Sequence, residues 1–121
     1  MRFIMMVKGD KNYESGAPPD PKLMAAIDQL TQEMTRAGIL LSAEGLFPSA
    51  AGAKVRVTKG KLTVTDGPFP EARELIGGFA ILEADSKADA IRLGSDFVRL
   101  HQNILGPTWE GECEIRQVAD L

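Results

Sequence analysis

The chain has very few of the residues from which metal and nucleophilic sites are usually built. Its 121 residues include one cysteine, Cys113, and one histidine, His101. A single cysteine cannot form an internal disulfide or supply the thiolates of a cysteine-based zinc site. A Cys–His pair, a Ser–His–Asp set and a glycine-rich phosphate loop cannot be assembled from this sequence either. We therefore expect no metal and no cofactor, and a cytoplasmic location as the default.

Long hydrophobic runs and basic clusters are also missing. No apolar stretch approaches the roughly 20 residues of a membrane span, and the apolar residues 3–7 have no small-residue cleavage site after them. The net charge is −3 and Lys and Arg do not cluster, which argues against nucleic acid, because its binding relies on cations that neutralise phosphates. With 44% hydrophobic residues, we expect one domain over residues 1–121, without a membrane or nucleic-acid partner.

Periodicity and turn residues predict two helices, four main strands and a hairpin. Asp20 followed by Pro21 is typical of a helix start, and the apolar residues that follow recur at helical spacing up to Gly38. Ser86 is the expected N-cap of a second helix, which ends before Gly106. The expected strands cover residues 2–8, 39–47, 75–84 and 112–118, and the hairpin covers residues 55–64 with its turn at Lys59-Gly60.

The order of these elements predicts an α+β, ferredoxin-like βαββαβ fold with an inserted β-hairpin. The first and third main strands lie at the centre of such a sheet, and residues 3–7 and 75–84 are the strand segments that have no polar face. Two helices can cover only one face of the sheet. Because a monomer would expose a large apolar patch, we expect the other face to pack on the same face of a second subunit, giving a homodimer.

Three motifs cover much of the chain: AGILLSAEGLFPS at residues 37–49, VTDGPFPEARELIGGF at residues 64–79, and ECEIRQV at residues 112–118. With these motifs the sequence resembles the YCII-related superfamily, and within it the DGPF-domain subgroup. The resemblance implies a dimeric α+β barrel of ferredoxin-like subunits. It implies no established reaction, so the function stays uncharacterised. Some relatives look linked to extracytoplasmic-function sigma factors, which suggests a regulatory context.

The sequence departs from the wider YCII group at its suggested catalytic dyad. That dyad pairs an Asp with a His between the first strand and the first helix. Here residues 9–20 and the first helix contain no His, and His101 falls at the end of the second helix, where the helix dipole favours a cation. The dyad is therefore not carried over to this chain.

Asp66 is the first catalytic candidate. An Asp-Gly pair followed by Pro68 makes a rigid turn, in which Phe69 can fill a hydrophobic edge. The turn alone explains the glycine and the prolines. The alternative is that this corner holds the Asp66 carboxylate at the mouth of a cleft, because site groups need fixed geometry.

Glu44 is the second catalytic candidate, since it interrupts an apolar strand. Simple alternation places it on the same face as Leu40 and Ser42. One interpretation is a structural ion pair with Arg56 or Arg73. The other is a carboxylate whose pKa is shifted by its environment and that works as an acid or base.

Two functions from different classes stay open. The first is a cofactor-independent enzyme for a small carbonyl-bearing or anionic molecule, with Asp66 as acid/base, Arg56 as anion clamp and Glu44 as second carboxylate. The second is a non-catalytic ligand-binding or regulatory module. The first loop, residues 9–20, is long enough for a lid, and its Tyr13 either caps a pocket or anchors packing. The ligand-binding candidates are therefore Arg56, Phe69, Tyr13 and Arg73.

Overall fold

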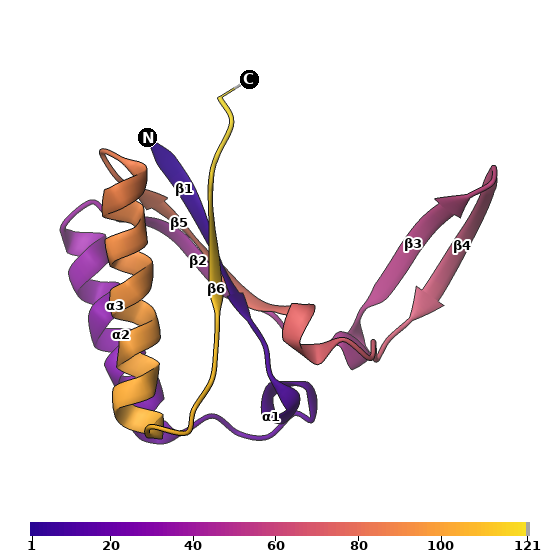
Figure 1. The fold of residues 1–121 in the computed structure, drawn as a ribbon, viewed down its shortest axis with the longest axis horizontal. Helices are drawn as coiled ribbons and strands as arrows, with labels where there is room; N and C mark the ends of the chain where they lie inside the picture. The colour runs from indigo at the N-terminus through magenta and orange to yellow at the C-terminus, as the bar shows by residue number, and fades with distance from the viewer. Residues whose placement is uncertain (121) are drawn as a thin grey trace.

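The computed structural model describes residues 1–120, without the side chain of Arg73. It shows a sheet with helices on one face, and a hairpin that projects away from the other face (Figure 1). The sheet is antiparallel with the strand order β2-β5-β1-β6. Its strands are β1 (Arg2–Lys8), β2 (Leu40–Gly45), β5 (Ile76–Glu83) and β6 (Cys113–Gln117). This is the strand order of a ferredoxin-like fold, with β1 and β5 at the centre as predicted.

The helices begin and end close to the predicted residues. They are α1 (Lys11–Glu14), α2 (Pro21–Arg36) and α3 (Lys87–Leu105), and two 3₁₀ turns, η1 (Ser49–Ala51) and η2 (Ala72–Glu74), lie in the connections. The Asp20 carboxylate accepts a hydrogen bond from the backbone N–H of Lys22 at 2.8 Å, and the Ser86 hydroxyl accepts one from that of Asp89 at 3.1 Å. The helical turn α1 was not predicted, because four residues are too few to show a periodicity.

The core lies between the sheet and the two long helices. Phe3 and Met5 of β1 and Ala80 and Leu82 of β5 are buried against them. Ala90 of α3 packs into the same layer with no exposed surface. One face of the sheet is thus covered by the two long helices of the same chain.

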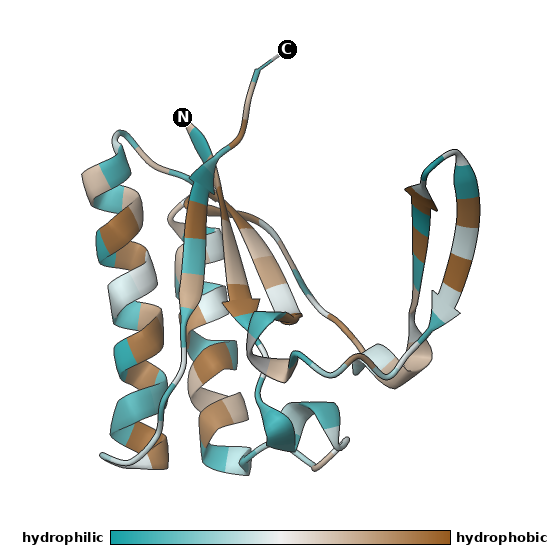
Figure 2. Ribbon diagram, turned by 45° about the vertical axis from the view of Figure 1, so that its right-hand side comes forward, coloured by the Kyte–Doolittle hydropathy of each residue, from teal (hydrophilic) through white to brown (hydrophobic). Residues whose placement is uncertain are grey.

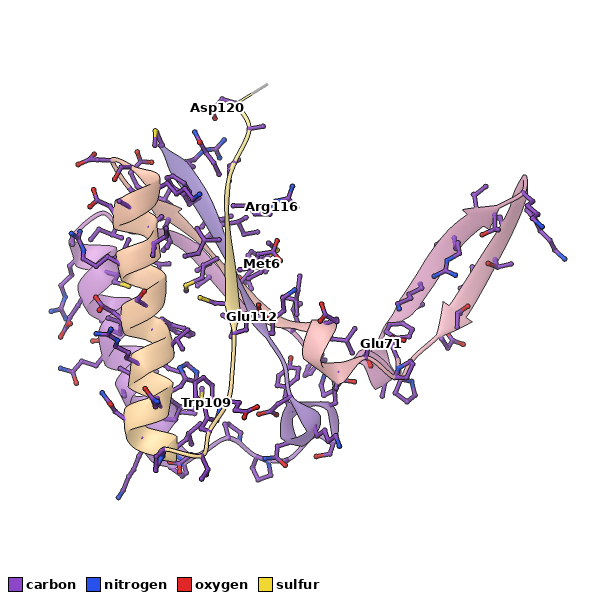
Figure 3. The ribbon with its side chains drawn as sticks, viewed as in Figure 1. Met6, Glu71, Trp109, Glu112, Arg116 and Asp120 are labelled. Atoms are coloured by element: carbon purple, nitrogen blue, oxygen red, sulfur yellow. The ribbon has the colours of Figure 1, made fainter. Side chains whose placement is uncertain are left out.

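The opposite face of the sheet carries no helix, and we call it the open face. Figure 3 shows Met6 and Arg116 on this side of the sheet. Its centre is apolar and half-buried, because the strand register places four such side chains side by side: Ile4, Met6, Phe79 and Ile81. The edge strand β6 adds Glu114 opposite Met6 and Arg116 opposite Ile4.

A β-bulge in β2 changes the predicted position of Glu44. Leu40 lies opposite Leu82, but the next paired residue, Ser42, lies opposite Ile81. The extra residue between them reverses the alternation. Leu40 therefore packs into the helix-covered core, whereas Ser42 and Glu44 lie on the open face. The prediction that Leu40 and Glu44 share a face is wrong for this reason.

Strands β3 (Ala53–Thr58) and β4 (Lys61–Asp66) form the predicted hairpin, and we call residues 53–66 the arm. Lys59 and Gly60 have φ of 53° and 78°, as a two-residue hairpin turn requires. Every residue of both strands is exposed. At the base of the arm, the Gly67 N–H donates to the Gly52 carbonyl at 2.9 Å. Figure 2 shows apolar and polar residues alternating along both strands.

Among residues 1–120, no helix has both the length and the apolar character that crossing a membrane requires.

Candidate functional site

The Asp-Gly-Pro-Phe segment, residues 66–69, forms a corner that is fixed on the turn η1. The backbone N–H of Phe69 donates to the hydroxyl of Ser49 at 3.0 Å. A Cβ atom on Gly67 would lie 1.7 Å from the backbone oxygen of Ser49, so only glycine fits this close approach. The peptide bond between Gly67 and Pro68 is cis. The predicted rigid corner is therefore present, and Ser49 is the residue that holds it.

Ser49 is itself held by Glu14 from the short helix α1. The Glu14 carboxylate accepts hydrogen bonds from the Ser49 backbone N–H at 3.0 Å and from the Ser49 hydroxyl. Neither residue stands out in the sequence. Their spacing of 35 residues in the chain gives no pattern that would have revealed the contact. The hydrogen bonds that run from Glu14 through Ser49 to Phe69 connect the first loop to the corner.

The register of the arm gives it one polar and one apolar face. Lys54 lies opposite Thr65 and Arg56 lies opposite Thr63. Because side chains alternate along a strand, these four share a face. The pair of Thr58 with Lys61 also falls on this polar face. The pairs of Val55 with Val64 and of Val57 with Leu62 occupy the other face, followed by Ala53 with Asp66 at the base of the arm.

The polar face of the arm and the corner together line a cavity of about 230 Å³, which we call the basic pocket. Figure 3 shows Glu71 at the base of the arm, where the corner joins it. The lining residues are Lys54, Arg56, Thr63, Thr65, Phe69, Pro70 and Glu71. The Lys54 ammonium lies 4.3 Å from the centre of the Phe69 ring, a cation–π distance.

The basic pocket has cations that no carboxylate neutralises closely. The ion pairs among the described side chains include neither Lys54 nor Arg56, so the predicted pair between Glu44 and Arg56 is not formed there. Glu71 is the acidic residue of the lining. Two cations and the Thr65 hydroxyl can donate hydrogen bonds to an anion, whereas the Thr63 hydroxyl donates to the Arg56 carbonyl at 3.4 Å. The pocket is therefore suited to a small anionic group.

The structure brings together only part of the predicted site. Arg56 and Phe69 line the same pocket. Asp66 is exposed at the end of β4 and Glu44 is exposed on β2, and neither is among the lining residues. The side chain of Arg73, a predicted ligand-binding residue, lies outside the described part of the structure.

Tyr13 anchors the first loop to the sheet. Its hydroxyl donates to the Gly77 carbonyl at 3.1 Å, and its ring lies 3.5 Å from the position of a Cβ on Gly77. Burial raises the pKa of the Tyr13 phenol and the neighbouring Glu14 carboxylate raises it further, while the backbone of Leu46 partly offsets these effects. The Tyr13 ring therefore packs on Gly77, whereas the tighter approach is at Gly78, where a Cβ would lie 3.0 Å from the backbone oxygen of Glu44.

A second hollow, of about 550 Å³, lies between α3 and β6. It contains none of the predicted site residues, and its polar groups come from Ser95, Arg99, Glu112 and Cys113. Burial raises the pKa of the Cys113 thiol, and the Glu112 carboxylate raises it further. The thiol is therefore protonated near neutral pH. Among the described residues, no group of three or more His, Cys, Asp and Glu side chains could hold a metal ion.

The contacts of His101 with neighbouring residues indicate a structural role. Its Nδ1 lies 2.8 Å from the Phe97 carbonyl oxygen one turn earlier, and its ring stacks on Trp109 with 5.4 Å between the ring centres. The stack fixes the connection between α3 and β6.

Two comparisons with known proteins found similar sequences. The chain is 31% identical over 121 residues to an uncharacterized protein of Rhizobium meliloti (strain 1021), and the match covers 98% of this chain and 93% of the relative. Residues 1–100 match the model of the YCII-related domain. This match, over most of the chain, shows that the protein belongs to the YCII-related domain family.

Proposed function

We propose that this protein is a homodimeric member of the DGPF subgroup that binds a small anionic molecule in the basic pocket. The observation that carries the proposal is the convergence of Lys54 and Arg56 on a cavity of about 230 Å³ without a close carboxylate partner. A cavity of this size suits a metabolite rather than a polymer. The subgroup assignment is supported by the corner, because Phe69 of the Asp-Gly-Pro-Phe segment lines that pocket.

The chemistry of the lining defines the ligand class. A carboxylate or phosphate group would receive hydrogen bonds from Arg56 in a planar, two-pronged geometry, while Lys54 would act as a point charge. The hydroxyl of Thr65 adds a neutral donor beside these cations, while the Thr63 hydroxyl donates to the Arg56 carbonyl. Phe69 offers an aromatic face for the uncharged part of the ligand.

The proposal is tested by calorimetric titration with matched probes. The probes are inorganic phosphate, a phosphate monoester, an aromatic carboxylic acid and the uncharged amide of the same acid. We expect the acid to bind and the amide not to bind. Arg56→Gln should weaken binding by about tenfold or more, because a hydrogen bond to a charged group contributes about 1.5–3 kcal/mol. Arg36→Gln, an exposed cation on α2, is the control and should change nothing.

Equal binding of the acid and the amide, or an unchanged affinity in Arg56→Gln, would contradict an anion site. Failure of every probe at millimolar concentration would contradict the pocket as a whole.

A second candidate function is catalysis on a ligand of the basic pocket, with Asp66 as the acid/base. Asp66 follows Thr65 at the base of the arm and is not itself a lining residue of the pocket. Catalysis is favoured by one observation: the Asp66 carboxylate is exposed, and none of the side-chain hydrogen bonds found in residues 1–120 involves it. A ligand that is converted on incubation with the wild type and stays unchanged with Asp66→Asn would establish catalysis. A ligand that is recovered intact from both proteins would leave a binding or regulatory module. Glu44 lies on the open face and is not among the lining residues, so it has no role in this second candidate function.

A further inference from the structure

The arm has an apolar face that nothing in its own chain covers. Val55 and Val57 of β3 are 68% and 67% exposed, and Leu62 and Val64 of β4 are 63% and 64% exposed. They form two adjacent cross-strand pairs on one face. A contiguous apolar surface of this kind on a soluble protein is typical of a contact with another molecule.

The arm also lacks support from the rest of its chain. Among the described residues, β3 and β4 form a separate sheet and pair only with each other, and the arm stands away from the four-stranded sheet (Figure 1). An isolated two-stranded hairpin is at best marginally stable in water. A well-formed arm therefore needs a surface to pack on.

The charge of the arm selects that surface. Its formal charge is +3, because one acid, Asp66, stands against four cations: Lys54, Arg56, Lys59 and Lys61. The whole chain has a charge of −3, so the residues outside the arm carry −6. Lys54, Arg56 and Lys61 lie on the polar face of the arm, so the net charge acts between whole surfaces and not through ion pairs within the apolar contact. Two arms brought together would repel each other, whereas an arm and the acidic body of another copy attract each other.

We propose that, in the homodimer, the apolar face of each arm packs on the body of the other subunit, so that the two subunits clasp each other reciprocally. This inference rests on the proposed dimer and adds a contact that stacked sheets alone do not require. It assigns Val55, Val57, Leu62 and Val64 to the interface between subunits. It leaves the opposite, polar face of the arm free to line the basic pocket.

The clasp links dimerisation to ligand binding. Four of the lining residues of the basic pocket belong to the arm: Lys54, Arg56, Thr63 and Thr65. Packing of the apolar face on the second subunit holds these residues in place. A ligand that binds the held arm more tightly than the free arm must stabilise the dimer by the same factor.

The test is sedimentation velocity over a range of protein concentrations. Threonine at positions 55, 57, 62 and 64 keeps a β-branched side chain in the strands while removing the apolar surface. For the variant Val55→Thr/Val57→Thr/Leu62→Thr/Val64→Thr, we expect the dimer dissociation constant to rise by more than about 100-fold. Far-UV circular dichroism should show an intact body. The control is Met24→Gln/Ile91→Gln, which removes two exposed apolar side chains from helices and should leave the dimer unchanged.

A second variant removes the arm, so its result does not depend on whether a substituted arm folds. Residues 53–66 are replaced by a two-residue turn between Gly52 and Gly67, whose backbone atoms are already hydrogen-bonded at 2.9 Å. This excision should also raise the dissociation constant. The charge variant Lys59→Glu/Lys61→Glu should weaken the dimer most at low salt, since screening removes its repulsion.

The outcomes separate the clasp from the dimer itself. A wild type that sediments as a monomer at millimolar concentration overturns both, and the apolar face then belongs to a different partner. A wild-type dimer that neither the threonine variant nor the excision weakens overturns the clasp alone. In that case Met6→Glu on the open face should dissociate the dimer, and stacked sheets are sufficient.

Discussion

The carboxylate of Glu14 accepts two hydrogen bonds from Ser49, one from its backbone N–H at 3.0 Å and one from its hydroxyl. The Ser49 hydroxyl also accepts a hydrogen bond from the backbone N–H of Phe69 at 3.0 Å. One serine thus fixes both the first loop and the corner that walls the basic pocket. We call these linked hydrogen bonds between Glu14, Ser49 and Phe69 the relay. The relay holds the corner in place, although Glu14 and Ser49 are not among the lining residues of the basic pocket.

We predict that Ser49→Ala destabilises the protein by about 1–3 kcal/mol, because it leaves acceptors on Glu14 and the N–H of Phe69 without their partner. Urea unfolding measures the change. Ser95→Ala is the matched control, since the Ser95 hydroxyl donates only to the Ile91 carbonyl on an exposed helix surface, and it should change stability by less than about 0.5 kcal/mol. Equal effects of the two substitutions would contradict the relay.

Gly67→Ala should be more disruptive than an ordinary glycine substitution. The added Cβ would lie 1.7 Å from the Ser49 backbone oxygen, so the corner has to move. We expect a loss of about 1–3 kcal/mol from this overpacking, together with weaker ligand binding in the basic pocket. Thermal unfolding of the variants measures this change. At Gly45 an added Cβ meets nothing within 4 Å, so Gly45→Ala is the control and should be close to neutral. A neutral Gly67→Ala would show that the corner is not held as described.

The raised pKa of Tyr13 predicts that the free energy of unfolding changes at alkaline pH. Its pKa is raised in the folded protein, mainly by burial, so the folded state keeps the phenol proton after the unfolded chain has lost it. The stabilisation by Tyr13 is therefore fully present below the ordinary phenol pKa of about 10 and is lost as pH rises through the folded value.

We expect Tyr13→Phe to be less stable than the wild type at pH 7 by about 1 kcal/mol, the contribution of the hydrogen bond to Gly77. The difference should shrink above about pH 10. Urea unfolding of both proteins at several pH values measures it. A gap that widens with pH would contradict a raised pKa for Tyr13.

Cys113 should react slowly with thiol reagents. Burial and the Glu112 carboxylate raise its pKa, and only the thiolate is a nucleophile. We expect alkylation by iodoacetamide at pH 8 to be at least about tenfold slower than for a free cysteine, and normal after unfolding in urea. Glu112→Gln should increase the rate modestly. A native rate equal to that of free cysteine would contradict the raised pKa of the thiol.

The sequence by itself determined the order of the elements and most of their ends. Asp20, Ser86 and the Lys59-Gly60 turn act on backbone within a few residues, so each can be recognised locally. The two strands without a polar face indicated the centre of the sheet, because burial on both sides leaves no alternation. These local signals also predicted the ferredoxin-like fold that the structure shows.

Only the tertiary structure decided which residues meet. Contacts between residues far apart in the chain, such as Glu14 with Ser49, depend on how whole segments dock and leave no periodic trace. A one-residue bulge placed Glu44 on the open face, and the register of the arm joined Lys54 and Arg56 to Phe69. The candidate site therefore emerged from the strand register and the docking of the corner, which no single stretch of sequence encodes.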